Sequence, residues 1–472
     1  MPASASDKIS TRVLLGYALT EMPLSMAATP IALFIAPFYG RELGLSLAAI
    51  GTILMLARIS DVITDPIVGQ LSDRTRTRAG RRKPWIILGA PLTMLSVWML
   101  FVPSAPVGNA YFAFWLVLLW LGWTFIAIPY YAWGAELSQS YHERTRIASV
   151  RTAIGVIGTL TAIVLPLITA RWLGYGDAIG ESLHLIATAA LVMFVVAMFL
   201  LWRVPEGAPI ETRRISLREG LRVMSRNGPF KRLMFGFTLA AAGPAIGGPL
   251  YILFVVHVLE ASVSSNLVLL VFYASNLAGI ALWNAVARRF GKRNAWLMGM
   301  AVAIVAQPGY WFLGPGDLYW MMLVFVVLGI GIGSFSALPA AMKADVVDLD
   351  RLRSGEDRTA LFFSVWSLAN KLVLAFSAGF ALNAVAYFGF QAKGENGPEQ
   401  ILALRVVFIF VPIAFYLIAW AVVWRYPISE ARHERLIGLL ERKKARRERA
   451  LAAGAQPLAR GALRTPTGPI GS

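Results

Sequence analysis

Residues 58–73 read RISDVITDPIVGQLSD and place two carboxylates, Asp61 and Asp65, inside a strongly apolar segment. Positions four apart lie on one face of a helix, one turn from each other, and Arg58 precedes the first acid by three residues. An acid at the centre of a membrane helix costs about 2.5–3.5 kcal/mol on insertion scales. Two acids on one face therefore need a compensating partner, and a bound cation is the most economical one.

The composition of the chain is typical of a polytopic membrane protein. Of its 472 residues 57% are hydrophobic and 15% are charged, whereas a soluble chain carries about 25% charged residues. The chain contains no cysteine, which excludes disulfides and cysteine metal sites. The sequence also has no P-loop, no histidine–cysteine metal cluster and no nucleophile elbow. These absences argue against an enzyme and against an ATP-driven pump.

Hydropathy predicts an all-α polytopic membrane protein. Its twelve predicted transmembrane helices lie at residues 12–38, 46–71, 84–103, 108–137, 146–171, 183–204, 230–258, 265–288, 294–313, 317–346, 357–389 and 401–425. Several exceed the roughly 20 residues that a bilayer requires, so tilt or extension beyond the lipid is expected.

The positive charge of the chain predicts how it lies in the membrane. The formal net charge is +18, and the basic residues concentrate in alternate loops and in the tail. This is the positive-inside pattern of membrane proteins and differs from the clustered basic surface of a nucleic-acid-binding protein. We therefore expect a multi-pass protein of the cell (inner) membrane, with both termini in the cytoplasm, membrane lipids as neighbours and no nucleic-acid partner.

The sequence also predicts two related halves. Gly80-Arg-Arg-Lys-Pro-Trp85 follows span 2, and Gly291-Lys-Arg-Asn-Ala-Trp296 follows span 8; the alternative is chance similarity between basic loops. Two six-helix halves repeated around a linker are typical of the major facilitator fold. The expected units are a cytoplasmic N-terminus (1–11), an N-terminal six-helix bundle (12–204), a cytoplasmic linker (205–229), a C-terminal six-helix bundle (230–425) and a basic cytoplasmic tail (426–472).

Span 2 carries the ligands that a hard cation prefers. Asp61, Thr64 and Asp65 offer two carboxylates and a hydroxyl in one compact set of oxygens, which predicts a cation site. Proton binding is a variant, because burial favours the neutral form of a carboxyl group. The competing interpretation pairs both acids with Arg58 and with Lys371, an isolated lysine in span 11, and needs no ion. The same lysine suggests coupling, because it can neutralise the acids when the ion leaves.

Spans 1, 4 and 5 supply candidate substrate contacts. Trp123 and Tyr131 lie in an aromatic segment of span 4, which indicates either a cavity wall or a lipid-facing surface. Arg151 is an isolated cation in span 5 that can hold an anionic substrate group or reach the cytoplasmic surface. In span 1, Glu21 is expected near the cytoplasmic end.

Charged residues at the cytoplasmic ends of the spans predict a gate. A gate needs ion pairs that break easily, and exposed pairs contribute only about 0–1 kcal/mol. The candidate gate residues are Asp73, Arg81, Glu136, Arg144, Asp345 and Arg358.

At these residues the chain resembles the glycoside–pentoside–hexuronide:cation symporters, the melibiose-permease family of the major facilitator superfamily. The resemblance covers roughly residues 12–425. It rests on Arg58…Asp61…Asp65-Pro66…Gly69, Gly80-Arg-Arg-Lys-Pro-Trp85, Ile128-Pro129 and Ala341-Met342…Asp345-Val-Val-Asp348 followed by Lys371.

The resemblance implies a secondary symporter that works by alternating access and needs no organic cofactor. It implies a coupling ion, sodium first and a proton as the alternative. Lys371 falls on the family's coupling lysine and Arg151 on its cavity arginine. The implied sodium ligands are Asp61, Thr64, Asp65 and Thr124.

One departure from the family pattern bears on the substrate. The acids with which the family holds its sugar in spans 1 and 4 are replaced here by Ser25 and Ala127, so we expect a cavity too apolar for the same contacts. The sodium–lysophospholipid symporters are similar in the same frame, at Tyr17-Ala18 and at residues 62–66. We therefore rank an amphiphile such as a lysophospholipid above a sugar or glycoside. A non-coupled carrier or lipid translocator is the second alternative, and a monomer is expected.

Overall fold

The structure of the protein is a computed structural model. It describes residues 8–104, 106–138, 140–173, 179–206, 227–261, 266–354 and 359–427. Within these ranges the chain forms helices and connecting loops and contains no β-strand. Most of the predicted linker, nearly all of the tail and Arg358 lie outside the described residues, so the expectations for them stay predictions.

The first group of helices precedes the linker. It comprises α1 (Thr11–Ala18), α2 (Glu21–Leu33), α3 (Ile35–Pro37), the π-helical turn η2 (Phe38–Glu42), α4 (Leu47–Ile59), α5 (Asp61–Arg74), α6 (Lys83–Phe101), α7 (Asn109–Glu136), α8 (Tyr141–Leu173) and α9 (Ile179–Trp202). The second group follows the linker. It comprises α11 (Gly228–His257), α12 (Asn266–Phe290), α13 (Lys292–Ala306), the 3-10 helix η3 (Gln307–Phe312), α14 (Leu318–Ser354), α15 (Thr359–Tyr387) and α16 (Pro398–Trp424).

These helices agree with the predicted membrane fold. Among the described residues, ten spans are long and apolar enough to cross a bilayer, and residues 11–42 form an eleventh that is bent by 53°. The predicted ninth span corresponds to the 15-residue α13 continued by η3. Pro308 near the start of η3 lacks a backbone N–H, which explains why the regular α-helix stops there. The chain is thus an all-helical, multi-pass membrane protein.

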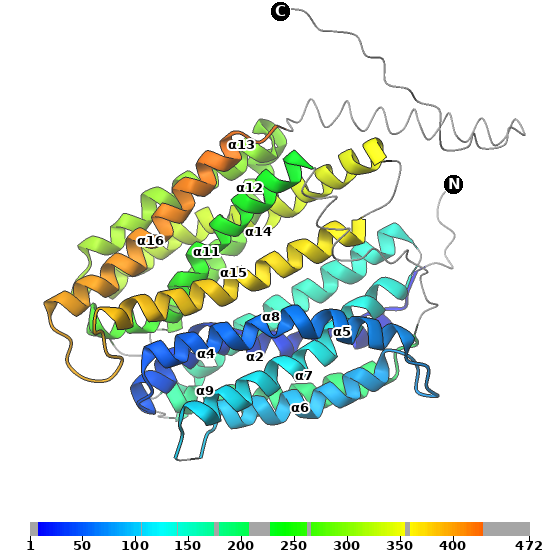
Figure 1. Ribbon diagram of the computed structural model, residues 1–472, viewed down its shortest axis with the longest axis horizontal. Helices are drawn as coiled ribbons and strands as arrows, with labels where there is room; N and C mark the ends of the chain where they lie inside the picture. The colour runs from blue at the N-terminus through cyan, green and yellow to red at the C-terminus, as the bar shows by residue number, and fades with distance from the viewer. Residues whose placement is uncertain are drawn as a thin grey trace, which may run out of the picture.

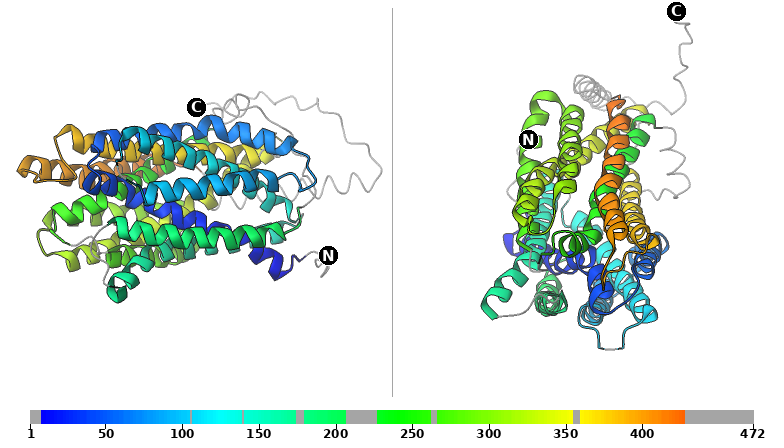
Figure 2. Two further views of the ribbon diagram at one scale, coloured as in Figure 1. Left: turned by 90° about the horizontal axis from the view of Figure 1, so that it is seen from below. Right: turned by 90° about the vertical axis from the view of Figure 1, so that its left-hand side faces the viewer.

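The two groups of helices lie side by side (Figure 1). They meet near the loop between α15 and α16 and diverge toward the end of α16. Figure 2 shows most helices running along one direction, as a membrane bundle requires. Contacts between the groups involve α4 with α15, α8 with α12, and α2 with α11.

Glycines let α4 and α15 cross closely. A Cβ on Gly51 would lie 2.9 Å from Asn383 Nδ2, and one on Gly379 would lie 2.9 Å from Met55 Cβ. The Thr52 hydroxyl lies 3.4 Å from the Asn383 side-chain oxygen at the same crossing. Small residues at a helix crossing allow this kind of backbone approach in membranes. The crossing therefore fixes the register between the two groups.

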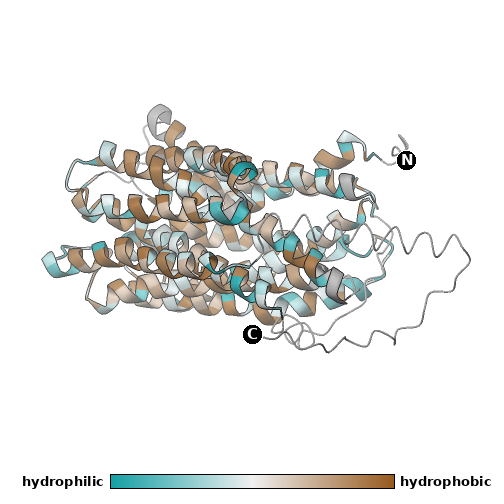
Figure 3. Cartoon of the chain, turned by 90° about the horizontal axis from the view of Figure 1, so that it is seen from above, coloured by the Kyte–Doolittle hydropathy of each residue, from teal (hydrophilic) through white to brown (hydrophobic). Residues whose placement is uncertain are grey.

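The outer surface of the bundle is apolar. Figure 3 shows hydrophobic residues along most of the length of the helices. Large side chains such as Tyr319 and Phe312 are each 81% exposed. Such exposure is unfavourable in water and favourable against lipid.

Candidate functional site

The two acids of residues 58–73 lie where one span changes from α4 to α5. Ser60 separates the two helices, and its hydroxyl donates to the Ala57 carbonyl at 2.6 Å. Pro66, inside α5, has no N–H to donate to the preceding turn. Weakened backbone hydrogen bonding of this kind commonly borders ion and substrate sites in transporters. Asp61 begins α5 and is only 2% exposed, and Asp65 follows one turn later.

Two cations balance the two acids. Lys371 of α15 places its Nζ 2.5 Å from Asp65 Oδ2 and 3.4 Å from Asp61 Oδ2. Arg58 lies 3.3 Å from Asp61 Oδ2, and its guanidinium stacks over the Trp120 ring at 3.2 Å. Buried charges are retained in a protein only when they are paired, so the four groups stabilise each other. We call Arg58, Asp61, Asp65 and Lys371 the charge cluster.

The charge cluster also presents oxygens that suit a hard cation. Thr124 of α7 donates its hydroxyl to Asp65 Oδ1 at 3.0 Å. Asp61 Oδ1 is buried and has no hydrogen-bond partner among the described residues. Thr64 donates to the Ser60 carbonyl at 3.1 Å, on its own helix. The structure thus brings Asp61, Asp65 and Thr124 together, and these residues fit sodium by the chemistry of their donors.

Two close helix crossings position the cluster. On the α6–α7 side, a Cβ on Gly122 would lie 2.6 Å from Thr93 Oγ1, so only glycine permits this approach two residues before Thr124. On the other side, the α4–α15 crossing at Gly379 holds α15 against the first group. Lys371 lies about two helical turns away from that crossing, which brings its ammonium to the acids of α5.

A second acid–base cluster lies in α2, α7 and α8. Glu21 Oε1 accepts a hydrogen bond from the Tyr131 hydroxyl at 3.1 Å, and Glu21 Oε2 lies 3.6 Å from Arg151 Nε. The Arg151 guanidinium stacks over the Tyr131 ring at 4.4 Å. We call Glu21, Tyr131 and Arg151 the arginine cluster. It combines a cation, an anion and an aromatic face, which are the groups that hold a polar part of a substrate.

Ser25 and Ala127 lie on the helices of the arginine cluster. A Cβ on Gly155 would lie 3.0 Å from Glu21 Cγ and 3.1 Å from Ser25 Oγ, so α2 and α8 pack closely there. Ala127 is buried one turn before Tyr131. The expectation that Ser25 and Ala127 leave a cavity too apolar for the family's sugar contacts stays a prediction, but Glu21 supplies a carboxylate in this region. The signal was present in the sequence, since Glu21 precedes Ser25 by one helical turn and shares its face.

Trp123 lies next to a residue that contacts the charge cluster. Its ring is 5.6 Å from that of Trp120, which stacks on Arg58. Trp123 is half-buried against the core. The expected role of Trp123 as a substrate contact stays a prediction.

Four of the candidate gate residues, Asp73, Arg81, Glu136 and Asp345, form ion pairs within one group of helices. In the first group, Glu136 accepts from Arg81 and from Arg82, each at 2.7 Å, and Asp73 pairs with Arg82 at 2.7 Å. Burial lowers the pKa of the Arg82 guanidinium, but Glu136 and Asp73 outweigh burial and raise that pKa overall. Arg144 donates to the Ser138 carbonyl at 2.7 Å. In the second group, Asp345 pairs with Lys292. A gate that joins the two groups stays a prediction.

Glu206 is a residue whose role was not predicted from the sequence. Its carboxylate accepts the backbone N–H groups of Arg81, Arg82 and Lys83, at 2.6, 3.0 and 2.9 Å. It therefore caps the start of α6. Gly80 has φ +111°, and a Cβ there would overlap the Glu206 carboxylate at 2.4 Å. The glycine of the repeated loop motif is thus explained by this cap.

The chain matches known proteins over nearly all of its length. A profile of the MFS/sugar transport protein family matches residues 16–430. The glucuronide carrier protein homolog of Escherichia coli is 23% identical over 452 residues, which cover 93% of this chain and 97% of the relative. The isoprimeverose transporter of Lactiplantibacillus pentosus is 25% identical and covers 92% of both chains. The human sodium-dependent lysophosphatidylcholine symporter 1 is 27% identical and covers 80% of this chain and 76% of its own.

A solved structure with the same fold supports this match. It is a bacterial homolog of the human lysosomal transporter Spinster, in an inward-facing and occupied conformation. It covers 89% of this chain and 97% of its own, with a TM-score of 0.64 and 16% identity. At that identity the likeness concerns the fold alone.

Proposed function

Since the chain belongs to the MFS/sugar transport protein family, whose relatives include cation symporters, we propose that it is a sodium-coupled symporter working by alternating access. It is a transporter and not an enzyme. The observation that carries the proposal is Lys371, which reaches from α15 in one group of helices to Asp61 and Asp65 in the other.

The charge cluster supports a mechanism of coupling. Sodium at Asp61, Asp65 and Thr124 competes with the Lys371 ammonium for the same carboxylates. Unit charges about 4 Å apart interact by roughly 4 kcal/mol at the effective dielectric of a protein surface. Displacing Lys371 therefore weakens an attraction between the two groups by an amount sufficient to change their arrangement. A proton on one acid is the alternative coupling ion.

The arginine cluster supports an amphiphile with a charged head as the first candidate substrate. The Arg151 guanidinium can hold a phosphate, and Glu21 can hold an ammonium group of the same head. A lysophospholipid with an amine-bearing head combines a phosphate and an ammonium group with an acyl chain. Relatives named as lysophosphatidylcholine symporters agree with this choice.

A glycoside is the second candidate substrate, and Glu21 is the observation that favours it. An adjacent carboxylate and guanidinium can accept and donate hydrogen bonds with neighbouring hydroxyl groups of a sugar. The Tyr131 ring adds a stacking surface for the sugar. The relatives that are named for glucuronide and isoprimeverose support this candidate.

The proposed orientation follows the charge pattern of the loops. We place the protein in the cell (inner) membrane as a monomer, with the N-terminal, linker and C-terminal segments in the cytoplasm.

A thermal-shift panel on the purified chain tests the proposal. Sodium, lithium and a pH series are each combined with a lysophospholipid and with a glycoside. A substrate that stabilises the protein only together with the ion identifies both through linkage. Asp65→Asn is expected to remove the sodium effect, whereas Glu399→Gln, an exposed acid at the start of α16, is expected to keep it. Sodium-dependent stabilisation that survives in Asp65→Asn would contradict the proposed site.

A further inference from the structure

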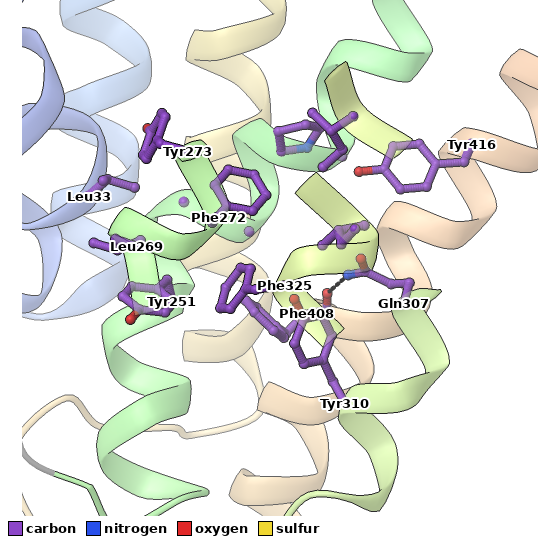
Figure 4. Close-up of a pocket in the computed structure, with 16 residues that line it drawn as sticks. Leu33, Tyr251, Leu269, Phe272, Tyr273, Gln307, Tyr310, Phe325, Phe408 and Tyr416 are labelled. Atoms are coloured by element: carbon purple, nitrogen blue, oxygen red, sulfur yellow. Dashed lines mark hydrogen bonds between the residues drawn. The ribbon is translucent and has the colours of Figure 1, made fainter. Parts of the chain in front are cut away.

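The second group of helices contains a cavity that neither acid–base cluster includes. Its volume is about 120 Å³, and it is lined by residues of α11, α12, η3, α14 and α16 (Figure 4). One lining residue, Leu33, comes from α2 of the first group. An engineered protein cavity of about 150 Å³ binds benzene, so the volume suits a single ring.

The walls of this ring cavity are aromatic and held in place. Phe325 packs edge-on against Tyr251, Phe272 and Tyr310, with ring centroids 5.2–5.6 Å apart. Tyr310 in turn contacts Phe408 at 5.2 Å. Mutual edge contacts of this kind fix the ring orientations, so the cavity offers stacking surfaces that need little rearrangement.

Two buried polar atoms in the cavity wall lack a partner. Gln307 is 4% exposed, and its Nε2 donates to the Phe408 carbonyl at 2.9 Å, which orients the amide (Figure 4). Within the described part of the chain, Gln307 Oε1 and the Tyr310 hydroxyl have no hydrogen-bond partner. Leaving such a group unsatisfied is unfavourable. A ligand hydroxyl can donate to Gln307 Oε1 and so remove that cost.

The chemistry of the lining excludes a charged ligand. None of the lining residues that the structure describes carries a charge. Burying an ion without a partner is strongly unfavourable. The ligand class that remains is a neutral ring with at least one hydroxyl group.

Glycines on α11 keep the cavity open. A Cβ on Gly243 would lie 2.3 Å from the Tyr416 ring, so only glycine allows Tyr416 to reach its position. A Cβ on Gly247 would meet only Phe408 Cε2, at 3.8 Å. Alanine is therefore tolerated at Gly247, whereas a large side chain would extend into the cavity.

We propose that this cavity is a binding site for a neutral, hydroxylated ring, with the ring between the aromatic side chains and its hydroxyl on Gln307 Oε1. The site is separate from the charge and arginine clusters and does not depend on the proposed sodium coupling. Because Leu33 belongs to the other group of helices, a bound ring also stabilises the contact between α2 and α11.

Cysteine protection tests the proposal, because the natural chain has no cysteine. Ile332→Cys places a thiol in the cavity, and Leu323→Cys places one on the outer face of the same helix, where Leu323 is 54% exposed. The full-length variants are treated with N-ethylmaleimide in the presence of phenol, toluene or sodium benzenesulfonate. Phenol at ten times its dissociation constant is expected to slow modification of Ile332→Cys about tenfold and to leave Leu323→Cys unchanged.

The three probes separate the parts of the proposal. Toluene, which lacks the hydroxyl, is expected to bind about tenfold more weakly than phenol, and the charged benzenesulfonate is expected not to protect. Protection of both cysteines to the same degree, protection by benzenesulfonate equal to that by phenol, or no protection at all would overturn the proposal.

Variants of the wall give an independent check. In the Ile332→Cys background, Gly247→Phe is expected to abolish protection by phenol and Gly247→Ala to preserve it. Gln307→Leu removes the Oε1 acceptor and is expected to abolish the tighter binding of phenol relative to toluene; should that variant not fold, Gln307→Met removes the same acceptor with a side chain of similar length. If phenol still binds more tightly than toluene, by the same factor, in a folded Gln307 variant, the assigned hydrogen bond is contradicted.

Discussion

The charge cluster and the arginine cluster contain the same kinds of groups but join different parts of the molecule. Lys371 and Asp65 belong to the two separate groups of helices. Glu21 and Arg151 belong to α2 and α8 of a single group. An ion that breaks the first pair changes the attraction between the groups, whereas a ligand that breaks the second pair does not. We therefore propose that the first cluster serves coupling and the second serves substrate binding.

The largest effect is expected for Lys371→Gln. Without the ammonium, sodium binding no longer changes an attraction between the groups, so sodium-driven uptake should fall by about 100-fold, the upper range of a typical coupling energy. Sodium affinity should rise, since a competing cation has been removed. Uptake into proteoliposomes and sodium-induced thermal stabilisation measure the two effects. A loss of sodium binding together with uptake would show that Lys371 is not the competitor.

Variants of the arginine cluster should show the opposite pattern. Arg151→Gln and Glu21→Gln each remove a charged hydrogen-bonding group, so substrate affinity should fall by about 10- to 100-fold. Sodium stabilisation without substrate should stay unchanged. A lysophospholipid substrate should depend more on Arg151, and a glycoside more on Glu21. A substrate affinity that is unchanged in both variants would show that the substrate binds elsewhere.

A stability change is expected at the α4–α15 crossing. Gly379→Val introduces a side chain where even a Cβ lies 2.9 Å from Met55 Cβ, so the free energy of unfolding should fall by about 1–3 kcal/mol. Gly247→Ala is the control, because a Cβ at this position would lie 3.8 Å from Phe408 Cε2, which is an ordinary contact distance. Thermal unfolding of the two variants measures the difference. Equal melting temperatures would mean that the crossing is looser than described.

The smallest effect distinguishes the two threonines. Thr124→Val removes a hydroxyl that contacts Asp65, and sodium affinity should fall by several-fold, about 1 kcal/mol. Thr124→Ser should retain most of the affinity. Thr64→Val should have a smaller effect than Thr124→Val, because the Thr64 hydroxyl donates to the Ser60 carbonyl. The reverse order would restore Thr64 as the principal hydroxyl ligand. Sodium titrations of thermal stability provide the measurement.

Most of the fold was predictable from the sequence, because hydropathy and loop charge are local properties. The ends of the predicted spans agree with the helices to within five residues, except that α14 runs eight residues beyond the predicted tenth span. The predicted ninth span is divided between the 15-residue α13 and η3. The pairing of Lys371 with the acids of span 2 was also predictable, since an isolated charge in a membrane helix needs a partner. The partner of Glu21 was not, because only the packing of α2 on α7 and α8 reveals it.

The sequence by itself determined that this is a membrane protein with a charged segment in span 2 and no cysteine. Those properties follow from residue types and their spacing along one helix. Only the tertiary structure decided that Glu21 faces Arg151, that Glu206 caps α6, and that Gln307 Oε1 remains unpaired in an aromatic cavity. Each of these depends on how closely two helices approach, and that distance is determined by glycines and side chains far apart in the chain.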